Sequence, residues 1–218
     1  MTTYIIRDAT PSDLGQILAI NTHYILNTVL TFRQTPPPPS TLLSKFNDIK
    51  ARRLPYLVAI DSSLKQKNED GDESNDLVLG YAYLSPYRGE MLSYAPTVEL
   101  TLFVHPSHQS RSVGSRLLAA ILKAAESVLH RGYEIGGIVD ETATKAVAEE
   151  NGLDISVRNV LAVMAVDSDG PDEGDKLRKW YVERGFVERG RLEKIGFKKG
   201  RWVDTVFLQY TVDTREGV

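Results

Sequence analysis

The segment from residue 96 to residue 130 constrains the fold more than any other part of the chain, because it joins a strand, a short turn and a helix. In PTVELTLFV (96–104) every second residue is aliphatic, so one face of the expected strand carries Val98, Leu100, Leu102 and Val104. Glu99 lies on the opposite face. From Ser115 to His130, apolar residues recur at helical spacing and predict an amphipathic helix. A strand that turns directly into such a helix indicates an α/β protein.

Strands and helices alternate along the rest of the 218 residues, which favours one domain, residues 1–218, around a mixed sheet. Thr10 and Asp13 have the spacing of a capping box and predict a helix that runs through Ile25. Residues 36–39 are all proline and predict an extended connector. Further helices are expected at 40–52 and within 174–186, and further strands at 3–9, 55–61, 77–86, 157–166 and twice within 186–212. We expect Trp180 and Trp202 in the core.

Two segments interrupt this alternation. Residues 62–76 are polar and acidic, and they predict a solvated insertion with a mobile tip between two hairpin strands. A calcium loop is disfavoured there, because the segment lacks the ligand and glycine spacing of such a loop. Residues 132–156 form an extra segment in which 142–151 has the pattern of a helix, and the sequence indicates no function for it.

Charge and composition exclude several classes of function. The net charge is −3 and no long basic stripe is present, so nucleic acid is not an expected partner. Because the chain has no cysteine, disulfides, thiolate nucleophiles and cysteine zinc sites are excluded. The amino terminus lacks a basic and then apolar leader, and no apolar run reaches the roughly 18 residues of a membrane span. We therefore expect a cytoplasmic protein without membrane contact.

The turn between the expected strand and helix is suited to an anion. In the run from Gln109 to Ser115, successive amides at the start of a helix could point at one anionic group, with Arg111 and the serine hydroxyls as further donors. The alternative is an ordinary capped helix start, since serine caps helices for local reasons. His105 and His108 flank the turn without a third ligand, so we expect no metal.

Several stretches resemble one enzyme family. They are VELTLFVHPSHQSRSVGS (98–115), IIRDAT (5–10), NTHYI (21–25), YR (87–88) with Tyr94 before TVE, and G-x-L-x-x-x-G-x-K-x-G-x-W-x-D (190–204). Together they cover most of the chain, and they resemble the GNAT superfamily of acyl-CoA-dependent N-acetyltransferases, in particular its phosphinothricin N-acetyltransferase branch. The resemblance implies a mixed, mostly antiparallel seven-stranded sheet with helices on both faces and central strands splayed around the cofactor. It also implies a homodimer.

The resemblance implies acetyl-CoA as cofactor, with its pyrophosphate wrapped by the turn. The implied contacts are Leu102, Phe103, Val104, Gln109, Ser110, Arg111, Ser112, Val113, Gly114 and Ser115. Ser112 departs from the pattern, because the family has glycine there. If that position needs a positive φ, serine costs about 1 kcal/mol or more, whereas in a helical conformation it costs little.

The same resemblance implies the reacting groups. Glu99 matches the glutamate of the T-V-E strand and is the expected general base, the alternative being a structural ion pair. Tyr181 matches the tyrosine that acts as general acid in many GNAT enzymes, the alternative being an aromatic packing residue. Seven residues earlier, Gly174 replaces the usual asparagine of the family. The implied acceptor-binding residues are Arg88, Tyr94, Asn21 and Phe32.

The expected function is therefore transfer of the acetyl group of acetyl-CoA to a small primary amine, an amino acid or an analogue. Two alternatives remain open from the sequence. One is a non-catalytic acyl-CoA-binding sensor domain, which the departures at Ser112 and Gly174 would suit. The other is a protein or peptide N-acetyltransferase, which needs an open groove in place of a closed pocket.

Overall fold

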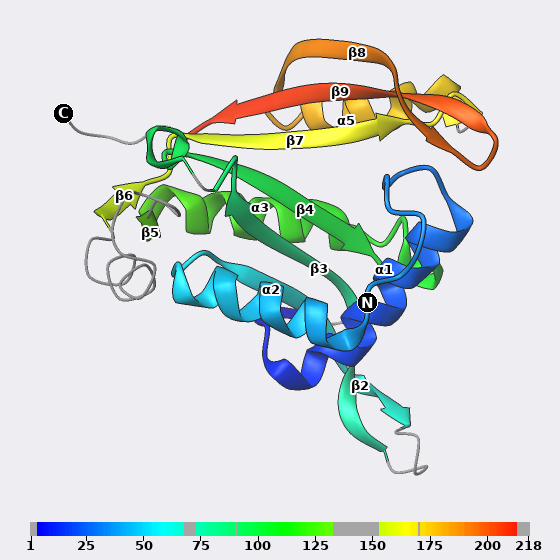
Figure 1. Cartoon of the computed structure of the whole chain (residues 1–218). Coiled ribbons are helices and arrows are strands. Elements are labelled where there is room, and N and C mark those ends of the chain that lie inside the picture. Colours follow the sequence, from blue (N-terminus) through cyan, green and yellow to red (C-terminus); the bar gives the residue numbers. More distant parts are fainter. Residues whose placement is uncertain (1–3, 68–72, 90, 133–152, 170, 213–218) are drawn as a thin grey trace.

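The computed structural model describes residues 4–67, 73–89, 91–132, 153–169 and 171–212. Seven strands form one sheet in the order β1-β2-β3-β4-β7-β9-β8 (Figure 1). Their bounds are β1 Ile5–Asp8, β2 Tyr56–Lys67, β3 Glu73–Pro86, β4 Thr97–Val104, β7 Asn159–Val166, β8 Val187–Lys198 and β9 Arg201–Thr211. A separate hairpin pairs β5 (Leu129–Gly132) with β6 (Leu153–Ser156). The mixed, mostly antiparallel seven-stranded sheet confirms the expected fold class.

Helices cover both faces of the sheet. They are α1 (Leu14–Asn27), α2 (Pro39–Ala51), α3 (Val113–Ser127) and α5 (Asp175–Val182). Phe46 of α2 packs on Tyr56 of β2, so α2 lies on the face that carries the tyrosines of β2 and β3. Leu117 of α3 packs on the opposite face. A Cβ added to Gly80 would lie 3.2 Å from the Leu117 side chain. No described helix is both long and apolar enough to cross a membrane.

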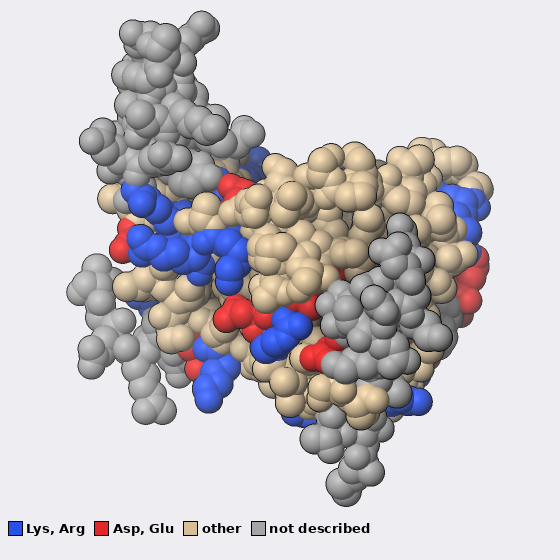
Figure 2. Space-filling model, turned by 90° about the horizontal axis from the view of Figure 1, so that it is seen from below, with Lys and Arg blue, Asp and Glu red and all other residues tan. Residues whose placement is uncertain are grey.

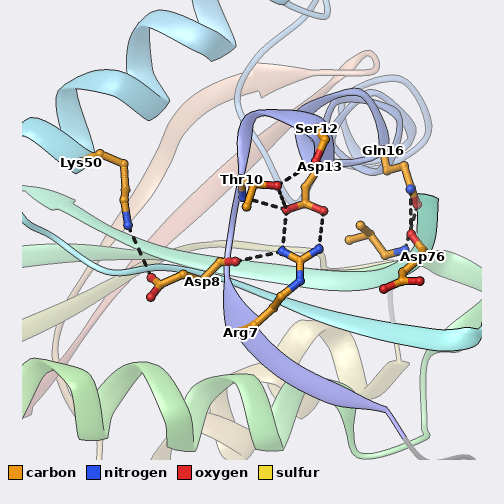
Figure 3. Close-up of polar contacts among 9 residues, drawn as sticks. Arg7, Asp8, Thr10, Ser12, Asp13, Gln16, Lys50 and Asp76 are labelled. Atoms are coloured by element: carbon orange, nitrogen blue, oxygen red, sulfur yellow. Dashed lines mark hydrogen bonds and ion pairs between the residues drawn. The ribbon is translucent and has the colours of Figure 1, made fainter. Parts of the chain in front are cut away.

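The entry into α1 is fixed by a buried carboxylate, as the capping-box spacing predicts. Asp13 accepts two hydrogen bonds of 2.8 Å from the guanidinium of Arg7 and one of 2.7 Å from the Thr10 amide (Figure 3). Desolvation would raise the pKa of Asp13, but the hydrogen bonds from Arg7 and Thr10 together outweigh it and lower that pKa. On the next turn, the Gln16 side chain donates to the Asp76 carbonyl and accepts from the Val78 amide. The start of α1 is thereby held to both β1 and β3.

One strand pair in the large sheet is parallel and short. β4 pairs with β7 only at Thr97↔Asn159, Val98↔Val160 and Glu99↔Leu161. Beyond Glu99, β4 continues along β3 as far as Val104, while β7 continues along β9 as far as Val166. The two central strands therefore part at Glu99, which confirms the expected splay.

Some expected boundaries were wrong. The helix expected to reach His130 ends at Ser127, and Leu129 and His130 belong to β5, where His130 hydrogen-bonds the Ala95 carbonyl at 2.7 Å. The proline run is extended only through Pro38, since Pro39 begins α2, where proline fits because a first-turn amide needs no intrahelical acceptor. The expected helix at 142–151 lies outside the described residues.

Two further expectations also needed correction. The acidic segment is shorter than expected, because β2 and β3 extend into it through Lys67 and from Glu73, and its tip at 68–72 lies outside the described residues. Trp202 is not a core residue, since 60% of it is exposed on the outer β8–β9 hairpin. Only Trp180 is partly buried against the core.

Candidate active site

The gap between the splayed strands is lined by main-chain polar groups. The Pro96 carbonyl accepts from the Arg158 and Asn159 amides, whereas the neighbouring Thr97 carbonyl accepts from Tyr87 on the β3 side. Because main-chain direction alternates along a strand, Leu100, Leu102 and Val104 point their amides and carbonyls toward β7. No described strand lies opposite Leu100 and Leu102 on that side. A ligand could therefore take the place of a strand here.

This alternation divides the three β4 residues expected to contact the cofactor. Leu102 directs its main chain into the gap. The Val104 carbonyl already accepts the Tyr24 hydroxyl at 2.7 Å. Phe103 turns its main chain toward Tyr81 of β3, and its ring packs on Tyr24 with 4.7 Å between ring centroids. Its main chain is thus engaged within the sheet, which removes Phe103 as a source of main-chain contacts in the gap.

The turn before α3 holds two serines in the left-handed region. Ser110 and Ser112 both have φ of +60°. The first helical hydrogen bond runs from the Arg116 amide to the Ser112 carbonyl, so the amides of Val113, Gly114 and Ser115 have no acceptor among the described residues. Left-handed residues alternating with ordinary ones turn successive amides inward, an arrangement that binds anions. The positive φ also decides the open question at Ser112: serine is strained there.

Side chains around the turn fix its position against α1. The Tyr24 hydroxyl, which donates to the end of β4, also accepts from the Gln109 amide nitrogen at 2.9 Å. Tyr4 donates to the Arg111 carbonyl at 3.4 Å. The side chain of Gln109 therefore connects the turn to α1 and to the end of β4 through the Tyr24 hydroxyl. The sequence did not reveal this connection. His105 accepts from the Ser107 amide, and the described residues contain no cluster of three metal-ligating side chains.

Glu99 lies where the strands part, on the sheet face that α1 and α2 cover. It is half-buried, and no hydrogen bond or ion pair engages its carboxylate among the described residues. Burial raises its pKa, and the nearby Lys45 ammonium partly opposes that shift. Among the described residues, the Lys45 ammonium is near enough to act on Glu99 but forms no direct ion pair with it. A carboxylate of this kind is suited to accept a proton.

Tyr181 is buried on α5, with its ring packed edge-on against Trp180 and Phe186 at centroid distances of 4.9 and 5.1 Å. Burial raises its pKa, so its hydroxyl keeps its proton at neutral pH. α5 also lies beside the turn, because a Cβ on Gly114 would lie 3.8 Å from Trp180 of α5. Just after the helix, Arg184 donates to the Ser115 hydroxyl at 3.1 Å. Tyr181 is therefore on the helix that flanks the amide-rich turn.

Gly114 and Gly174 differ in how strictly the backbone requires glycine. A Cβ on Gly114 would meet Val104 at 3.4 Å and Trp180 at 3.8 Å, which are ordinary packing distances where α3, β4 and α5 meet. Gly174 has φ of +82°, and a Cβ there would lie 2.7 Å from the Asp167 carbonyl oxygen. The asparagine of the family therefore does not fit this backbone, which explains the departure.

The four expected acceptor-binding residues fall into three places. Asn21 points at the tyrosine face of the sheet and lies 3.3 Å from the Tyr81 hydroxyl. Arg88 and Tyr94 are on the loop before β4, with the guanidinium 5.8 Å from the Tyr94 ring centroid. Phe32 lies against Gly196 of the β8–β9 hairpin and is 41% exposed. Only Asn21 is placed on the same sheet face as Glu99.

Lys45 is a residue of this site that the sequence analysis missed. Its ammonium lies 4.8 Å from the ring centroid of Tyr83, whose β4 partner is Thr101, two residues from Glu99. Sequence spacing gives no signal for it, since Lys45 lies outside the apolar stripe of its helix.

Comparisons with known proteins agree with this geometry. The model of the acetyltransferase (GNAT) family matches residues 32–152, more than half of the chain. The chain is 27% identical over 208 residues to the phosphinothricin N-acetyltransferase of Alcaligenes faecalis, covering 95% of this chain and 81% of that protein. It is 26% identical to the L-methionine sulfoximine/L-methionine sulfone acetyltransferase of Pseudomonas aeruginosa, covering 95% and 94%.

A solved structure is similar along the whole chain. It is a GNAT superfamily phosphinothricin acetyltransferase from Sinorhizobium meliloti, in complex with acetyl-CoA. The TM-score is 0.69 at 26% identity, and the match covers 100% of this chain and 96% of that one.

Proposed function

Because the chain belongs to the acetyltransferase (GNAT) family, we propose that it transfers the acetyl group of acetyl-CoA to the amino group of a small amine, an amino acid or a close analogue. The observation that carries the proposal is the gap between β4 and β7, which opens at Glu99 and along which no described strand pairs with Leu100 and Leu102. The relatives that act on phosphinothricin and on methionine sulfone support the acceptor class.

The residues of the gap and the turn fit acetyl-CoA. The amides of Val113, Gly114 and Ser115, which have no acceptor in the part of the chain that the structure describes, are donors for a diphosphate, as is the turn of left-handed serines before them. Leu102 offers main-chain groups that could pair with an amide-bearing arm. When bound, acetyl-CoA would supply an acetyl group activated as a thioester.

Glu99 and Tyr181 are the groups that would move protons. A free alkyl amine is mostly protonated at neutral pH, so the carboxylate of Glu99 would take a proton from the acceptor nitrogen, directly or through water. Tyr181 holds a proton on its hydroxyl and could deliver it to the departing sulfur. A half-buried carboxylate with a raised pKa and no ion-pair partner within the described chain favours an enzyme over a binding domain that only senses acyl-CoA.

Two measurements test the proposal. Calorimetric titration with acetyl-CoA should show one site per chain, and a panel of amino acids should then release free coenzyme A. Glu99→Gln should lower kcat by about 10²-fold with acetyl-CoA binding unchanged. The exposed Glu126→Gln on α3 is the matched control and should keep full activity. Full turnover by Glu99→Gln at saturating amine would remove Glu99 as the base.

The pH profile gives an independent check on Glu99. Its pKa is raised by burial, and the base acts only when ionised, so kcat should fall as the pH drops through that raised pKa. The acidic limb should therefore lie above the range of an ordinary glutamate, and Glu99→Gln should lack it. An acidic limb at the ordinary glutamate pKa would contradict the assignment.

A further inference from the structure

Lys45 presents an ammonium group to the same part of the sheet as Glu99 but has no carboxylate partner among the described side chains. It stands over the Tyr83 ring, 4.8 Å from the centroid. By contrast, Lys50, one and a half turns further along α2, pairs with Asp8 at 3.5 Å, and Arg52 pairs with Asp48 at 3.1 Å. Lys45 is thus a cation that the described fold leaves available.

The position of Lys45 is set by the sheet register. Tyr83 is opposite Thr101, and Ser85 is opposite Glu99, so Tyr83 and Glu99 share one face of adjacent strands. Residues two apart on a strand are about 7 Å from each other, which a lysine side chain can bridge. The ammonium is close enough to Glu99 to favour its ionised form.

We infer that Lys45 binds the α-carboxylate of the acceptor and so selects amino acids over simple amines. The inference rests on the proposed acetyl transfer. In an α-amino acid the nitrogen and the carboxylate are attached to one carbon, so a single molecule can place its nitrogen at Glu99 and its carboxylate at Lys45. The flat face of Tyr83 lies beneath the ammonium and holds it in place, since a cation over an aromatic ring is attracted to it.

The test compares two acceptors that differ only in the carboxylate. L-methionine sulfone and its α-carboxamide are assayed with wild type, Lys45→Met, Lys45→Arg and the control Lys50→Met. Lys45→Met should lower kcat/KM at least 30-fold for the acid, chiefly through KM, and less than threefold for the amide. Lys45→Arg should restore part of the loss, and Lys50→Met should behave as wild type with both.

The outcomes separate this inference from the proposed function. Equal losses for acid and amide would overturn the role of Lys45 in carboxylate binding. If the wild type acetylates amines but does not prefer the acid, the proposed function stands and the inference fails. If the wild type acetylates no amine in the panel, the proposed function itself fails. Lys45→Met should also move the acidic limb of kcat to higher pH, because the ammonium no longer favours the ionised Glu99.

Discussion

At the scale of single residues, the anion-binding turn depends on backbone conformations that serine does not prefer. Ser110 and Ser112 have φ of +60°, and each side chain is exposed, so neither gains packing that would offset the strain. Glycine adopts this conformation without a steric cost. The strain is therefore retained in a segment whose amides are free to bind a ligand.

Ser112→Gly should stabilise the fold by about 0.5–1 kcal/mol, because relief of the left-handed strain exceeds the extra freedom gained by the unfolded chain. Urea unfolding measures the change. Ala119→Gly on the exposed side of α3 is the control. It should lower the free energy of unfolding by about 1 kcal/mol, because glycine is unfavourable inside a helix. A destabilised Ser112→Gly variant would show that the serine hydroxyl makes a contact worth more than the strain.

At the scale of elements, the β8–β9 hairpin holds the loop after α1. Lys198 donates to the Thr31 carbonyl at 2.6 Å, and Gln34 donates to the Phe197 carbonyl at 2.8 Å. Phe32 lies against Gly196 between these two bonds. This is why Phe32, expected at the acceptor, is instead placed on the outer hairpin. Burial lowers the pKa of Lys198, and its bond to Thr31 compensates part of the cost of placing a charge there.

Lys198→Met should destabilise the protein by about 1–3 kcal/mol, because it leaves the Thr31 carbonyl without its donor. Lys198 is only 2% exposed, so the apolar part of the methionine can fill its place. Lys199→Met is the matched control, since Lys199 donates to the Leu26 carbonyl from an exposed position and should cost less. Equal losses in urea unfolding would show that burial does not strengthen the Lys198 contact.

At the scale of the whole molecule, the sheet consists of two parts joined by a short parallel contact. β1, β2, β3 and β4 form one part, and β7, β9 and β8 form the other, as Figure 1 shows. Only three register pairs connect them. Figure 2 shows basic and acidic side chains mixed on the underside of the molecule, next to surfaces without charge.

Acetyl-CoA should stabilise the whole fold, because a ligand in the gap contacts both parts of the sheet. At a concentration of 100 times Kd the gain is about 2.7 kcal/mol, which a thermal melt would detect as a higher Tm. Hydrogen exchange should slow at Leu100 and Leu102, whose main chains face the gap. Protection confined to the turn before α3, with none on β4, would place the ligand outside the gap.

The sequence by itself determined the local part of the site. Alternation placed Glu99 opposite the aliphatic row, and the serine-rich turn with its following helix predicted the free amides before α3. These features depend on the periodicity of neighbouring residues and on helix geometry, which the sequence carries directly. The resemblance to the family motifs also predicted the seven-stranded sheet and acetyl-CoA as the acetyl donor.

Tertiary structure alone decided the contacts between distant segments. It brought Lys45 near Glu99 and packed Phe32 against Gly196. It also placed His130 in a strand, where it hydrogen-bonds the Ala95 carbonyl, although local spacing had predicted helix there. It also set the positive φ of Ser112, which local sequence left open. Such contacts depend on the pairing register and on packing between elements far apart in the chain. Local propensity does not specify them.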